Sequence, residues 1–221
     1  MEMLVLASAA FLLTHLASGM PVRAKLVAAL GEWPYRGIYS TLAFLTLGWA
    51  IWAYAHAPAQ ELLWAPLRHL PVAVMPFAFI LAVGGLARNP TAVGAEKLLK
   101  SEEPARGMIR ITRHPFMWGV MLWAGAHILA NADAKSLVFF GGLLLVAALG
   151  TLSQEKRKAR AAGEDWQRFA AATSHLPFVA VVQGRNRVAW REIGWWRPLI
   201  GLALFAAFFA AHPWLFGVRP Y

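Results

Sequence analysis

The sequence predicts an all-α integral membrane protein, a bundle of about six transmembrane helices. Three observations predict it: an apolar composition, long windows without charge, and an uneven distribution of basic residues. Of the 221 residues, 59% are hydrophobic and 14% are charged, whereas a soluble domain carries about 25% charged residues. A chain this apolar cannot cover itself with polar side chains, so a bilayer is its expected solvent. The alternative, core helices of a large soluble enzyme, fails because nothing amphipathic remains to cover them.

Six windows lack Asp, Glu, Lys and Arg, and each has close to the roughly 20 residues that a spanning helix needs. We expect one domain over residues 1–221, with helices near 3–20, 38–57, 70–87, 115–131, 136–153 and 198–217. A signal peptide would carry basic residues before its apolar stretch. Here Arg23 and Lys25 follow the first window instead, so we expect that helix to be retained.

Basic residues mark the side of the membrane that each loop faces. The three loops 21–36, 88–113 and 155–197 carry 18 of the 21 Lys and Arg residues, and the other side keeps Arg68, Lys135 and Arg219. Positively charged loops stay in the cytoplasm, so we expect a bacterial inner-membrane protein with both termini outside. The net charge of +10 then orients the chain and attracts anionic lipid. Nucleic-acid binding is a poor interpretation of it.

The two longest basic loops contain amphipathic sequence. Residues 155–180 begin with a charged helical stretch, are interrupted at Gly163, and continue with Trp166 and Phe169 one turn apart. That spacing is typical of a helix lying on the membrane surface. Residues 95–107 resemble a short interfacial helix that ends at Gly107.

Seven histidines provide the candidate ligands. We interpret His56, His69 and His175 as interfacial or solvated. Three others, His15, His127 and His212, lie inside apolar windows, where a polar group usually faces the bundle interior with a partner or a ligand. Imidazole is a common ligand of haem and of metal ions, and a hydrogen bond between helices is the alternative. At a rise of 1.5 Å per residue, His127 and His212 both lie about 20 Å from the cytoplasmic edge of the membrane. Depth alone therefore favours these two histidines as the axial ligands of one haem.

His114 begins the fourth window directly after two arginines, Arg110 and Arg113. Pro115 suits the first turn of a helix, and the helix dipole there favours an anion. We therefore expect His114 and Arg113 to anchor an acidic group: a haem propionate, a lipid headgroup or a cofactor carboxylate. His114 lies roughly 20 Å along the helix from His127, too far for both to bind one iron.

Several uncommon motifs occur together in this chain. They are FLLTHLASG, GEWPYRGIYS, NPTAVG, GMIRITRHPFMWGVMLWAGAHILAN, GEDW through SHLPF, and AHPWLFG. In this order they resemble the NnrU family of bacterial membrane proteins over nearly the whole chain. The resemblance implies an accessory role in denitrification, in the expression or maturation of the nitrite and nitric oxide reductases.

The same motifs resemble the domain of plastid ζ-carotene isomerases, membrane enzymes that hold haem b. The resemblance implies haem b with His15 and His127 as axial ligands, Arg110 and Arg113 as candidate propionate contacts, and a lipid-like polyene as a substrate for cis–trans isomerisation. Those enzymes have a cysteine three residues before the second ligand, where this chain has Ala124. The chain contains no cysteine, so the same redox-gated mechanism is in doubt.

A more distant resemblance is to isoprenylcysteine carboxyl methyltransferases. They share the run Arg113–His114–Pro115, and where they carry a glutamate pair this chain has Gln154–Glu155. The resemblance implies S-adenosylmethionine bound near Arg113, His114 and Glu155. The sequence thus leaves three hypotheses: a haem protein with a redox or isomerase role, a membrane methyltransferase, and a non-enzymatic assembly factor.

Overall fold

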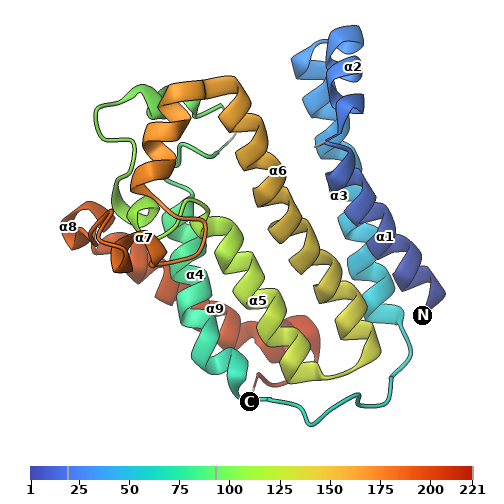
Figure 1. Ribbon diagram of the computed structural model, residues 1–221. Coiled ribbons are helices and arrows are strands. Elements are labelled where there is room, and N and C mark those ends of the chain that lie inside the picture. The colour runs from blue at the N-terminus through green and yellow to red at the C-terminus, as the bar shows by residue number, and fades with distance from the viewer. Residues whose placement is uncertain (19, 93, 221) are drawn as a thin grey trace. The chain divides into compact units, whose positions relative to one another are not determined.

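A computed structural model describes residues 1–18, 20–92 and 94–220, and this part of the chain is all-α (Figure 1). The helices are α1 (Glu2–Ala17), α2 (Pro21–Leu30), α3 (Glu32–His56), α4 (Leu70–Gly85), α5 (Pro115–Asn131), α6 (Ala134–Ala172), α7 (Val179–Val182), α8 (Trp190–Ile193) and α9 (Trp196–Phe216), with two 3₁₀ turns, η1 (Glu96–Lys100) and η2 (Gly107–Arg110). The chain divides into two compact units. Unit 1 comprises residues 1–70 and 124–153, and unit 2 comprises residues 71–123 and 154–221.

A helix occupies each of the six windows predicted to span the membrane. Within the described residues, three helices are long and apolar enough to cross a bilayer, namely α3, α6 and α9, and a fourth is added if α1 and α2 form one bent span. The helix predicted near 38–57 is α3. It begins at Glu32, six residues before the predicted start, because Gly31 (φ +86°) ends α2 directly before it. Pro34 lies in its first turn, where a missing N–H removes no helical hydrogen bond.

Unit 1 is built on α1 and α3, which lie side by side (Figure 1). Leu4, Ala7 and Phe11 of α1 are buried. The Tyr54 ring of α3 stacks on Phe139 at 4.8 Å between centroids. The Tyr54 hydroxyl lies 2.9 Å from the Ser136 hydroxyl, so a polar contact as well as ring stacking holds α3 to the start of α6.

Unit 2 brings α4 close to α5 and α9 at glycines. A Cβ at Gly119 of α5 would lie 2.6 Å from the carbonyl oxygen of Ala78, and one at Gly201 of α9 would lie 2.8 Å from Cα of Ile80. Small residues let helix backbones approach in this way where the hydrophobic effect between helices is weak. Glycine at these two positions therefore sets the helix spacing on both sides of α4.

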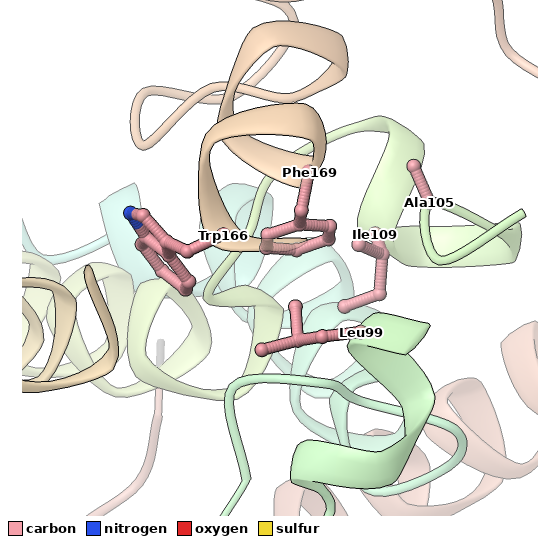
Figure 2. Packing of buried hydrophobic residues seen from close by; sticks show 5 residues of the cluster. All are labelled: Leu99, Ala105, Ile109, Trp166 and Phe169. Atoms are coloured by element: carbon pink, nitrogen blue, oxygen red, sulfur yellow. The ribbon is translucent and has the colours of Figure 1, made fainter. Parts of the chain in front are cut away.

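The predicted break at Gly163 is present, since α6 has φ +50° and ψ −118° at this residue. Beyond it, Trp166 and Phe169 are 6% and 0% exposed. They pack on three residues of the 95–110 segment, namely Leu99, Ala105 and Ile109 (Figure 2). These rings therefore pack inside unit 2, and the placement of their helix on the membrane surface stays a prediction. Together with the 95–110 segment they form a small core. Instead of the interfacial helix predicted at 95–107, this segment contains two short 3₁₀ turns, η1 and η2.

Candidate functional site

Glu155 is the centre of a buried polar cluster in unit 2. It lies on α6 directly after the uncharged stretch that ends at Gln154. Arg113 binds its carboxylate with two donors, Nε to Oε1 at 2.8 Å and Nη2 to Oε2 at 3.1 Å. Nε2 of His114 lies 3.0 Å from the same Oε1, and the His114 side chain is only 1% exposed. One carboxylate thus holds both residues that precede α5.

His175 joins this cluster from the segment after α6. Its backbone carbonyl accepts hydrogen bonds from the Thr112 hydroxyl at 2.6 Å and from Nε1 of Trp118 at 2.8 Å. Its ring centroid lies 5.4 Å from that of His114. One ligand atom each of His114, Glu155 and His175 lie within 4.8 Å of one another, so the three side chains can act on a common atom.

The charges of this cluster are fixed by its contacts. Burial raises the pKa of the Glu155 carboxyl, but the hydrogen bonds from His114 and Arg113 outweigh burial and hold that pKa at about 2. Burial, and then the charge of His114, lower the pKa of His175 below its ordinary value. At neutral pH the cluster therefore contains an ionised carboxylate and a neutral His175.

Arg110 and Arg113, the candidate propionate contacts, both have carboxylate partners within unit 2. Arg110 pairs with Glu192, with Nε to Oε2 and Nη2 to Oε1 both at 2.8 Å. Arg113 pairs with Glu155, and its Nη1 also donates to the carbonyl oxygen of Thr173 at 3.2 Å. Both arginines are thus paired within the chain, and the expected external acidic group at Arg113 and His114 stays a prediction.

The histidines predicted to bind haem lie apart from this cluster in the sequence and divide between the units. His15 on α1 and His127 on α5 belong to unit 1, whereas His212 on α9 belongs to unit 2. The His15 ring lies 4.3 Å from Phe11, and the His127 ring stacks on Phe140 at 5.0 Å. All three of these histidines are half-buried.

Unit 1 also contains an apolar groove of about 400 Å³, and neither His15 nor His127 is among its lining residues. Leu12 of α1 and Ile128 of α5 both line it. The remaining lining residues come from α1 and from the first part of α6: Val5, Ser8, Ala9, Leu137, Val138, Gly141, Gly142, Leu144 and Leu145.

His175 is the site residue that sequence reasoning missed. We expected it to be interfacial or solvated, as His56 and His69 are, and both of those are exposed. His175 is instead half-buried beside His114, because its backbone is tied to Thr112 and Trp118. No periodicity signals such a tie, although His175 lies within the SHLPF motif.

Glu155 predicts a pH dependence of stability. Its pKa falls from 4.5 to about 2 on folding, so its contribution is complete above pH 4.5 and is lost as the pH falls toward 2. The melting temperature of detergent-solubilised wild-type protein should exceed that of Glu155→Gln by a constant margin above pH 5, and the margin should shrink toward pH 2. Glu61→Gln, at an exposed carboxylate, should follow the wild type throughout. A margin that does not change with pH would contradict the ion-pair assignment.

The sequence is similar to known proteins along nearly its whole length. The family model described as "NnrU protein" matches residues 3–220. The chain is 27% identical over 183 residues to the Arabidopsis thaliana 15-cis-zeta-carotene isomerase, covering 80% of this chain and 49% of that protein. It is 32% identical over 82 residues to the Zea mays enzyme of the same name, covering 37% of this chain and 22% of that protein.

The chain therefore spans at most about half the length of these plant relatives. No solved structure matches it significantly. The match over residues 3–220, together with the candidate membrane-spanning helices, shows that this chain is a membrane protein of the NnrU family.

Proposed function

We propose that the chain is a haem b protein of the bacterial inner membrane, with His15 and His127 as the axial ligands. The observation that carries this proposal is that both histidines belong to unit 1, each beside an aromatic ring, whereas His212 belongs to unit 2. A bis-histidine site contained in one unit requires His15 with His127. The division into units therefore favours His15 with His127 as the ligand pair. The depth estimated from the sequence had favoured His127 with His212.

The surroundings of His15 suit a haem ligand. Its Nδ1 lies 2.9 Å from the carbonyl oxygen of Phe11. A ligating histidine commonly donates its second ring N–H to such a carbonyl, which fixes the tautomer and the ring orientation. Nε2 is then the ligand atom. The groove lined by Leu12 and Ile128 has aliphatic side chains, two glycines and one serine, which suits an apolar macrocycle or a lipid-like chain.

Haem would supply one-electron chemistry at this position, and the chain's residues would hold it and exclude water. Its proposed role is redox or accessory, in the expression or maturation of denitrification reductases. The apolar groove and the similarity to enzymes named 15-cis-zeta-carotene isomerase favour a second candidate, cis–trans isomerisation of a lipid-like polyene. Ala124, which is fully buried, replaces the cysteine of those enzymes, so we do not propose a thiolate ligand switch.

A separate observation favours a third candidate. Arg113, His114 and Glu155, which the methyltransferase resemblance singled out, lie in one cluster. Binding of S-adenosylmethionine there would make the chain a membrane methyltransferase. If the purified protein has no Soret band but binds S-adenosylmethionine, this candidate replaces the haem proposal. If neither cofactor binds, a non-enzymatic assembly factor remains.

We propose six membrane spans with both termini outside, because 18 of the 21 basic residues lie in alternate loops. Single cysteines introduced at Ser153 and at Pro220 should react with a membrane-impermeant maleimide from opposite sides of the membrane. Ser153 should be labelled only in inverted vesicles, and Pro220 only in intact spheroplasts. The cysteine-free chain is the control, and labelling of both sites from one side would exclude this topology.

The haem proposal predicts a Soret band in the absorption spectrum of purified wild-type protein. His15→Ala and His127→Ala should each remove the band or shift it strongly, because each removes an axial ligand. His69→Ala, at an exposed histidine, is the matched control and should keep the wild-type spectrum. Loss of the band in His212→Ala with retention in His15→Ala would refute the proposed ligand pair.

A further inference from the structure

We propose that His114, Glu155 and His175 bind one divalent transition-metal ion, either Zn²⁺ or Fe²⁺. This site goes beyond the haem proposal and does not depend on it. All three residues lie in unit 2, whereas both proposed haem ligands lie in unit 1. The donor set, two imidazoles and one carboxylate, is one that Zn²⁺ and non-haem Fe²⁺ use when open coordination positions are left for water or substrate.

The distances agree with a shared ion. Two ligands that each lie about 2.1 Å from a metal ion are roughly 3.0 Å apart at right angles and roughly 3.4 Å apart in a tetrahedral site. Nε2 of His114 and Oε1 of Glu155 are 3.0 Å apart, and His175 brings its ligand atom within 4.8 Å of both. The three ligand atoms therefore surround a space of the size that one metal ion occupies.

The neighbouring residues hold two of the ligands in place. Trp118 and Thr112 fix the backbone of His175 through its carbonyl oxygen. Arg113 binds both oxygens of the Glu155 carboxylate, with Nε on Oε1 at 2.8 Å and Nη2 on Oε2 at 3.1 Å. Metal-binding carboxylates are usually hydrogen-bonded in this way by residues that do not touch the ion. The same guanidinium balances the carboxylate charge when no metal is bound.

Zinc titration of the full-length protein tests this site. Protein in detergent micelles, treated with EDTA and dialysed, is titrated with Zn²⁺ by isothermal calorimetry. We expect about one equivalent to bind to the wild type. Glu155→Gln and His175→Ala should each weaken binding by at least about 100-fold, since losing a ligand costs more than the 10–100-fold typical of an outer-shell partner. His69→Ala, at an exposed histidine, should bind as the wild type does.

Melting temperatures measured on the same samples separate a lost ligand from a lost fold. His175→Ala removes a side chain but keeps the carbonyl that Thr112 and Trp118 contact, so it should remain folded. Binding of Zn²⁺ to His175→Ala with wild-type affinity, or no binding to the wild type, would overturn the proposal and leave only an ion-pair cluster. The Soret band of each sample reports haem separately, so failure of one proposal is not mistaken for failure of the other.

Discussion

The polar part of unit 2 depends on the carboxylate of Glu155. Arg113 and His114, which precede α5, both bind it, and Arg113 also donates to the carbonyl of Thr173 after α6. Removing one partner of such a half-buried network leaves a charge without its partner, which is more destabilising than the loss of an exposed ion pair. The same carboxylate therefore ties the start of α5 to the charged half of α6 and, through Arg113, to the residue that follows α6.

Ring stacking, polar contacts and close backbone packing organise the rest of the protein, and their use differs between the two units. In unit 1 the polar contact between Tyr54 and Ser136 accompanies stacked rings. In unit 2, Gly119 and Gly201 allow close backbone contact with α4. A chain that faces lipid gains little from burying aliphatic side chains between its helices, so close backbone packing and satisfied polar groups become the main sources of stability.

Helix positions were predictable from the sequence because a bilayer imposes a simple rule on length and charge. The Gly163 break was also predictable, since glycine tolerates a positive φ that other residues avoid. The burial of Trp166 and Phe169 was not predictable, because their spacing fits a lipid-facing helix and a core-facing helix equally well. Only their contacts with the 95–110 segment show that they face a core. His175 was missed for a similar reason: backbone ties to Thr112 and Trp118 bring it to the cluster, and such contacts between distant segments leave no local pattern. Arg113, His114 and Glu155 were named from a motif resemblance, whereas their mutual contacts came only from the fold.

The central claim is that His15 and His127 alone hold the haem iron, separately from the Glu155 cluster. Electron paramagnetic resonance of the oxidised protein tests it most directly, because the spin state of haem iron reports its axial ligands. The account predicts a low-spin, bis-histidine signal that is the same in wild type and in Glu155→Gln. A high-spin signal in the wild type, or conversion from low spin to high spin in Glu155→Gln, would contradict it, since the iron would then lack one of the two histidines or depend on the Glu155 cluster.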